Sequence, residues 1–130
     1  MAETKTIKAS LKGLRQTPRK VSLVASLVRG RSVADALVIL EHTPKRAAKP
    51  LAKLIASAEA NAKTAHNLDG KSLVIDLLQV TAGPRLKRFR PGAMGRAKPY
   101  QKKSSHVLVA VTGEVKLKKK PAAKATKEAK

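Results

Sequence analysis

GPRLKRFRPGAMGRAKPYQKK, residues 83–103, is the stretch of this 130-residue chain that decides its fold. It holds eight lysines and arginines and no acidic residue, so it is too polar for a core and too long for an ordinary hairpin loop. Two β-rich segments flank it, at residues 72–82 and 104–113, and Val107, Val109 and Val111 alternate as in a sheet covered on one face. We therefore expect two strands that continue past the sheet as a protruding hairpin over residues 83–104, with a reach of about 30 Å.

The tip of this hairpin is expected near residues 91–95. Pro91 and Gly92 suit the central pair of a type II turn. The hairpin has almost nothing to bury except Leu86, Phe89 and Met94, and isolated two-stranded hairpins are marginal in water. Its order is therefore expected to depend on a surrounding anion.

The residues before the hairpin predict one strand and three helices. Residues 4–12 alternate between apolar and polar side chains, as in a half-buried strand. A first helix is expected to begin at Thr17 and Pro18, with the threonine hydroxyl as N-cap, and to end at Gly30. Ser32, followed by Asp35 three residues later, predicts the cap of a second helix.

A long third helix is expected from Thr43 and Pro44 to about His66. Pro50 lies inside this pattern, where its ring and missing N–H should kink the helix or move its regular start to that point. The fold class is thus α+β. Residues 1–114 are expected to form a single domain that includes the hairpin, and residues 115–130 a disordered basic tail.

The charge distribution indicates a polyanionic partner. The formal net charge is +21, yet residues 32–82 carry only six basic and five acidic residues. The excess lies in residues 1–31, 83–103 and 115–130, and phosphate backbones are the commonest polyanion that neutralises such segments. The two aromatic residues, Phe89 and Tyr100, argue against a single-strand binder built on stacking platforms.

Other classes of protein find little support in the sequence. There is no cysteine, no apolar run long enough to cross a bilayer, and no signal-peptide pattern. Gly70-Lys71-Ser72 lacks the glycine that a phosphate-binding loop needs at position 65, where alanine stands. His42, His66 and His106 have no metal-ligand spacing. We therefore expect no enzyme activity, no metal and no cofactor.

Several motifs resemble one known family. The hairpin segment GPRLKRFRPGAMGRA and the following SSHVLVAV are similar to ribosomal large-subunit protein twenty-two of the bacterial type. TPRK at residues 17–20, VRG at 28–30, TPKRAA at 43–48 and SAEANA at 57–62 agree with it, so the resemblance covers about residues 5–113.

The resemblance implies three helices on a small three-stranded antiparallel sheet, in a monomer within the cytoplasmic ribosome. It implies a hairpin threaded through large-subunit ribosomal RNA, which it helps to organise during assembly. The hairpin tip would line the nascent-peptide tunnel near ribosomal protein four. The implied RNA-binding residues are Arg15, Arg19, Lys20, Arg29, Lys45, Arg85, Lys87, Arg88, Arg90, Arg96, Lys98, Lys102, Lys103 and His106, and the implied tip is Pro91, Gly92, Ala93, Met94 and Gly95.

Two other functions fit the charge pattern. An architectural DNA-binding protein would lay a basic β-arm in a groove, with Pro91 as a wedge. An enzyme that acts on nucleic acid would need an acidic metal-binding cluster, which the sequence does not suggest.

Overall fold

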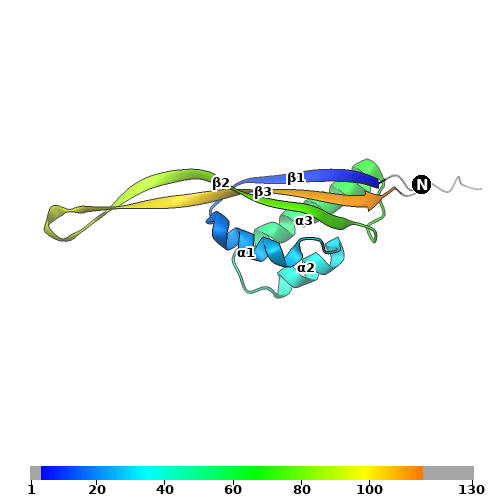
Figure 1. Cartoon of the computed structure of the whole chain (residues 1–130), viewed down its shortest axis with the longest axis horizontal. Helices are drawn as coiled ribbons and strands as arrows, with labels where there is room; N and C mark the ends of the chain where they lie inside the picture. The colour runs from blue at the N-terminus through cyan, green and yellow to red at the C-terminus, as the bar shows by residue number, and fades with distance from the viewer. Residues whose placement is uncertain (1–3, 116–130) are drawn as a thin grey trace, which may run out of the picture.

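A computed structural model describes residues 4–115 of the chain. The elements are β1 (Thr4–Leu14), α1 (Pro18–Val28), α2 (Val33–His42), α3 (Ala48–His66), β2 (Val74–Pro91), the single 3₁₀ turn η1 (Ala93–Gly95) and β3 (Ala97–Glu114). The strands form one antiparallel sheet in the order β1-β3-β2, with the helices beside it (Figure 1). The expected α+β class, with three helices and a three-stranded antiparallel sheet, is confirmed. The tail expected over residues 115–130 lies, apart from Val115, outside the described residues.

Helix α1 begins where the sequence predicts, although not through the expected cap. Pro18 occupies the first helical position, but the side chain of Thr17 makes no capping hydrogen bond. The helix therefore begins with a fixed proline φ and without a satisfied hydroxyl cap. Gly30 follows the helix with a φ of +70°, a conformation that glycine adopts without steric cost.

Helix α2 has the cap that Ser32 and Asp35 predict. The Ser32 hydroxyl accepts a hydrogen bond of 3.2 Å from the Asp35 backbone N–H, and it lies 2.7 Å from the Asp35 carboxylate, to which it donates. The Asp35 carboxylate thus binds the hydroxyl and not the backbone N–H that a full capping box would use.

Helix α3 begins later than the Thr43–Pro44 signal predicts and close to Pro50, in agreement with the alternative that this proline moves the regular start. Thr43 is instead the C-cap of α2, where its hydroxyl donates to the carbonyl of Ile39 at 2.6 Å, and the regular helix begins at Ala48. Pro50 consequently lies in the first turn, where a missing N–H costs no intrahelical hydrogen bond. The helix ends at Asn67, which is left-handed with a φ of 50°.

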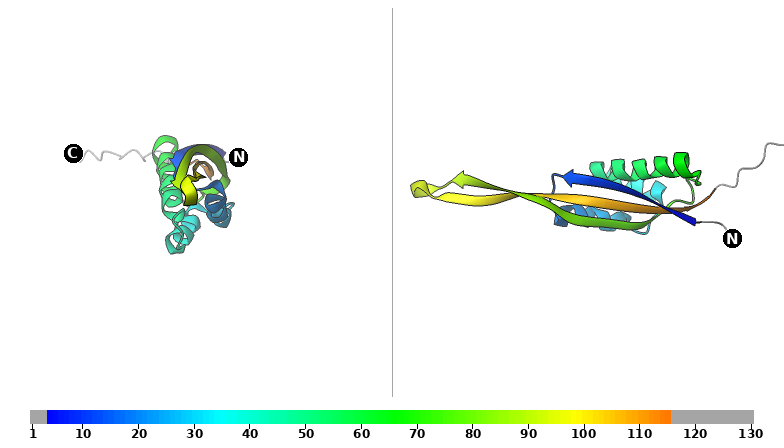
Figure 2. Two further views of the ribbon diagram at one scale, coloured as in Figure 1. Left: turned by 90° about the vertical axis from the view of Figure 1, so that its left-hand side faces the viewer. Right: turned by 90° about the horizontal axis from the view of Figure 1, so that it is seen from above.

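One apolar core joins the helices to the sheet. The helices lie on one face of the sheet, as the end-on view in Figure 2 shows, and the inward residues of β3 face them. The largest fully buried side chains are Leu51, Ile55, Leu68, Leu73, Ile75, Leu78, Val21, Val28, Val33, Val107, Val109 and Val111. The backbone N–H groups of Gly30 and Val33 donate to the carbonyls of Ile75 and Leu73, so the α1–α2 connection covers the first part of the β2 edge.

Beyond the core, β2 and β3 continue as a twisted two-stranded ribbon (Figures 1 and 2). The ladder shifts register between Ala82 and Arg85, and it then stays paired from Arg85–Lys103 to Pro91–Ala97. Within this shift the Ser104 hydroxyl donates to the carbonyl of Pro84 at 2.7 Å. The ribbon therefore has a defined register although no core supports it.

The chain reversal at the tip differs from the expected type II turn. Pro91 is the last paired residue of β2, and Gly92 is extended with a φ of −121°, whereas the third residue of a type II turn needs a positive φ. The reversal is made by η1, in which Met94 and Gly95 have φ values of 57° and 69°. The Gly92 N–H donates to the carbonyl of Arg96 at 2.7 Å and closes the tip.

Candidate nucleic-acid interface

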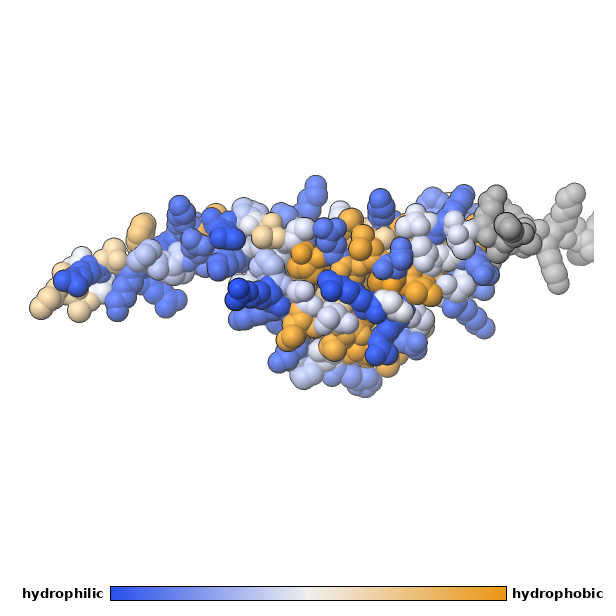
Figure 3. All heavy atoms as spheres, in the orientation of Figure 1, coloured by the Kyte–Doolittle hydropathy of each residue, from blue (hydrophilic) through white to orange (hydrophobic). Residues whose placement is uncertain are grey.

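The hairpin presents its cations without internal partners of opposite charge. Residues 77–113 contain no aspartate or glutamate, so no carboxylate of the hairpin can neutralise them. None of residues 84–103 is buried, and hydrophilic side chains project along the ribbon in Figure 3 while apolar atoms gather over the body. A cationic, solvated ribbon of this kind favours binding to a polyanion.

The register places cations on both faces of the hairpin. Residues that pair across an antiparallel ladder share a face, and neighbours along a strand lie on opposite faces. One face therefore carries Arg85, Lys87 and Lys103, and the other carries Arg88, Arg90, Lys98 and Lys102. A polyanion on one side alone would leave part of this charge unmatched, so the ribbon is suited to being surrounded.

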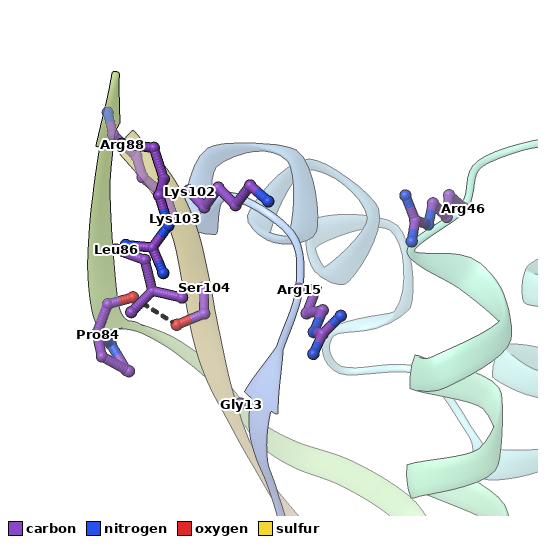
Figure 4. A pocket seen from close by; sticks show the side chains of 9 residues that line it. All are labelled: Gly13, Arg15, Arg46, Pro84, Leu86, Arg88, Lys102, Lys103 and Ser104. Carbon is purple, nitrogen blue, oxygen red and sulfur yellow. Dashed lines mark hydrogen bonds between the residues drawn. The ribbon is translucent and has the colours of Figure 1, made fainter. Parts of the chain in front are cut away.

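A basic groove lies where the hairpin leaves the body (Figure 4). It has a volume of about 600 Å³ and no acidic side chain in its lining. Arg15 and Arg46 reach it from the body, and Arg88, Lys102 and Lys103 come from the hairpin. Because the two groups of cations come from segments far apart in sequence, only the folded chain forms this site.

A second groove continues from the first onto the N-terminal end of α1. Arg15, Arg46 and Lys103 line both grooves, and Lys20 and Lys45 are added in the second. Its lining also has no acidic residue. The two grooves form a continuous cationic surface, which we call the basal surface, lined by Arg15, Lys20, Lys45, Arg46, Arg88, Lys102 and Lys103.

Arg46 is absent from the residues expected to bind RNA. It lies in the connection between α2 and α3, inside the TPKRAA motif, and lines both grooves. Its position directly after Lys45, which was expected to bind RNA, is the sequence signal that could have identified Arg46. The sequence alone does not reveal that the connection between α2 and α3 lies near Arg15, just after β1.

Eight expected RNA-binding residues are absent from the linings of these two grooves, five of them on the hairpin and three on the body. Arg19 is exposed on α1, and the Arg29 side chain donates through Nε to the carbonyl of Leu78 at 2.9 Å. His106 accepts a hydrogen bond at Nδ1 from the Gly13 N–H at 2.9 Å. Arg29 and His106 therefore each have a structural contact that joins separate elements of the body.

The two aromatic residues have different surroundings within the hairpin. The guanidinium of Arg90 lies 4.8 Å from the centre of the Tyr100 ring, within the range of a cation–π interaction. Phe89 lies on the opposite face from Arg90, and 69% of it is exposed. Leu86 and Met94 are also exposed, which leaves apolar side chains among the cations.

Residues 4–115 contain neither a cluster of metal ligands nor a helix suited to a membrane. No three histidine or acidic side chains in this part of the chain gather closely enough to hold a metal ion. None of its helices has the length and apolar character required to span a bilayer.

The fold and the basal surface define a basic protein built to contact a polyanion, with cations on a compact body and on a projecting ribbon. The model of one family, ribosomal protein L22p/L17e, matches residues 9–112. The chain belongs to this family. It is therefore a structural, non-enzymatic protein of the large ribosomal subunit, and it binds ribosomal RNA and neighbouring ribosomal proteins.

Proposed function

We propose that residues 83–104 thread between segments of large-subunit ribosomal RNA and hold them in position as the subunit assembles. The observation that carries this proposal is the placement of cations on both faces of a ribbon that contains no carboxylate and no buried residue. Bringing RNA segments together costs electrostatic repulsion, and cations inserted between them lower that cost. The basal surface extends the same contact onto the body.

The RNA-binding residues proposed are those of the basal surface together with the remaining cations of the hairpin. Phosphate contacts by Arg85, Lys87, Arg90, Arg96 and Lys98 follow from their exposure and from the absence of acidic neighbours. Arg19 is proposed as an outlying contact on α1. Arg29 and His106 are proposed to act through the donors that their existing hydrogen bonds leave free.

The tip is proposed to line the nascent-peptide tunnel, near ribosomal protein four. Residues 91–95 carry no charge, in contrast to the strands on either side, and Met94 is 96% exposed. An uncharged end on a cationic ribbon suits a surface that faces a passing peptide more than one that faces phosphate. The ribosome that contains the protein is proposed to be a bacterial, cytoplasmic one.

A site-specific crosslink tests the position of the tip. The chain has no cysteine, so a single introduced thiol is a unique attachment point. In ribosomes with an arrested nascent peptide, Ala93→Cys carrying a photoreactive group should crosslink the peptide. Ala65→Cys, also an exposed alanine but at the end of α3, should not. Crosslinks from both positions, or from neither, would contradict the proposed location.

A further inference from the structure

We infer that Phe89 is a stacking site for one unpaired RNA base, and that Lys87 and Lys103 contact phosphates of the same RNA strand. This inference rests on the proposed threading of the hairpin through RNA, and it adds a class of contact that phosphate neutralisation alone does not include. The structure offers three independent grounds for it.

The first ground is the exposure of the ring. Phe89 is the only phenylalanine of the chain, and 69% of it is open to solvent in a segment that has no core of its own. Its partner across the ladder is Pro99, a flat apolar side chain that widens the surface around the ring. Aromatic surface is costly to leave in water, so a binding partner that covers it stabilises the complex.

The second ground is the shape and chemistry of the surroundings. A shallow groove on this part of the hairpin is lined by Lys87, Phe89, Pro99, Tyr100, Gln101 and Lys103. Lys87 and Lys103 share the face of Phe89 and both lie on its body side, where they can contact phosphates of the same RNA strand. The Gln101 amide can donate to and accept from a base edge. Proteins bind single-stranded RNA with this combination: an aromatic ring stacks on the base, and cations contact the phosphate backbone.

The third ground is the contrast with Tyr100. That ring already has the Arg90 guanidinium 4.8 Å from its centre, whereas no cation of residues 4–115 lies over the Phe89 ring in this way. Two aromatic residues are too few for a platform that binds a run of bases, as the composition indicates. A single open ring is sufficient for one splayed base.

One competing occupant is an apolar surface of a neighbouring ribosomal protein. Such a partner would cover Phe89 by burial alone, and leucine would then serve nearly as well as phenylalanine. A base needs the face of a ring, so tyrosine should substitute and leucine should not. Whether binding requires an aromatic ring at position 89 therefore distinguishes an RNA base from an apolar protein surface.

The test uses full-length protein in which phenylalanine is isotopically labelled, because the single phenylalanine gives one set of ring resonances. Titration with a short oligoadenylate should move these resonances upfield, as stacking on a base does. Inorganic polyphosphate of matched charge should leave them in place. Oligoadenylate binding that saturates by fluorescence anisotropy without an upfield shift would overturn the inference and leave the proposed function standing. Failure of the protein to bind ribosomal RNA at all would overturn both.

Substitutions of Phe89 provide a second test of base stacking. Phe89→Leu should weaken oligoadenylate binding about tenfold with an unchanged dependence on salt, because stacking involves no counterion release. Phe89→Tyr should bind like the parent chain. Val38→Ala, which trims an exposed apolar side chain on α2, is the matched control and should also leave binding unchanged. Equal affinity of the leucine and tyrosine variants would contradict base stacking.

Discussion

The Nδ1 atom of His106 accepts a hydrogen bond of 2.9 Å from the backbone N–H of Gly13, 93 residues earlier in the chain. Gly13 has a φ of +72° and lies in the irregular pairing between Leu11 and Leu14, where β1 reaches its end beside β3. The contact joins β1 to β3 close to where the hairpin leaves the three-stranded sheet. His106 therefore fixes the base of the hairpin through its Nδ1 atom.

Replacement of this imidazole should loosen the end of β1. His106→Ala removes the acceptor of the Gly13 N–H and should lower the free energy of unfolding by about 0.5–1.5 kcal/mol. His106→Asn can present its Oδ1 atom in place of Nδ1 and should retain most of that stability. Urea unfolding followed by circular dichroism measures the free energy of unfolding of both variants. An asparagine variant as unstable as the alanine variant would show that the lost stability does not come from this hydrogen bond.

Removal of the buried Ser105 hydroxyl, in contrast, should not lower the stability of the protein. Ser105 is fully buried, and its Oγ has no hydrogen-bond partner within residues 4–115. Because a buried polar atom without a partner costs free energy, Ser105→Ala should be neutral or should stabilise the protein by up to about 1 kcal/mol. A higher melting temperature in calorimetry is the expected result, and a loss of more than about 1 kcal/mol would reveal a partner for the hydroxyl.

Much of the fold was predictable because its signals are local. The alternation in β1, the proline at the start of α1 and the Ser32–Asp35 cap each involve residues within one turn or a few positions. Thr43 and Pro44 carry the usual start signal but do not begin α3, because the Thr43 hydroxyl binds the preceding helix. The alternative start near Pro50 is the one that the structure has. The turn type at the tip was wrong because Pro91 is held in the ladder opposite Ala97, which puts the reversal at Met94 and Gly95, still within the expected residues 91–95.

The candidate site was only partly predictable for a different reason. Charge along residues 83–103 is visible in the sequence, but the basal surface depends on tertiary contacts that bring Arg15 and Arg46 near Lys103. The backbone contact of Arg29 and the Gly13 contact of His106 are likewise non-local, so their structural roles required the folded chain.

Removal of charge from the basal surface should weaken RNA binding in a salt-dependent way. The triple variant Arg15→Gln, Arg46→Gln and Lys103→Gln removes the three cations shared by the two grooves. Each lost phosphate contact lowers the slope of log K against log salt by about 0.7–0.9, so the slope should fall by about 2–3. Fluorescence anisotropy with a large-subunit RNA fragment, measured over a salt series, gives this slope.

A variant with the same loss of charge elsewhere provides the control. Lys5→Gln, Lys63→Gln and Lys71→Gln are exposed changes at the end of the body opposite the hairpin. This control should alter the slope less than the basal variant. The same fall in both would mean that net charge, and not the arrangement of the grooves, determines binding.

The cations next to the tip should affect assembly. Arg90 is the last cation before the tip and Arg96 the first after it, so they should hold its approach to the RNA. Arg90→Gln together with Arg96→Gln should reduce the yield of complete large subunits in sucrose gradients. Lys124→Gln with Lys127→Gln, outside the described residues, is the comparison, and an equal deficit in the two variants would contradict a special role for the tip.

Amide hydrogen exchange of the full-length protein, alone and bound to large-subunit RNA, tests most directly whether the hairpin is ordered by RNA. The amides of residues 84–103 should exchange rapidly in the free protein, since isolated two-stranded ribbons are marginal, while buried β3 residues such as Val109 stay protected. In the complex, residues 84–103 should become as protected as the body. Strong protection of the hairpin in the free protein, or no gain of protection on RNA binding, would contradict the account.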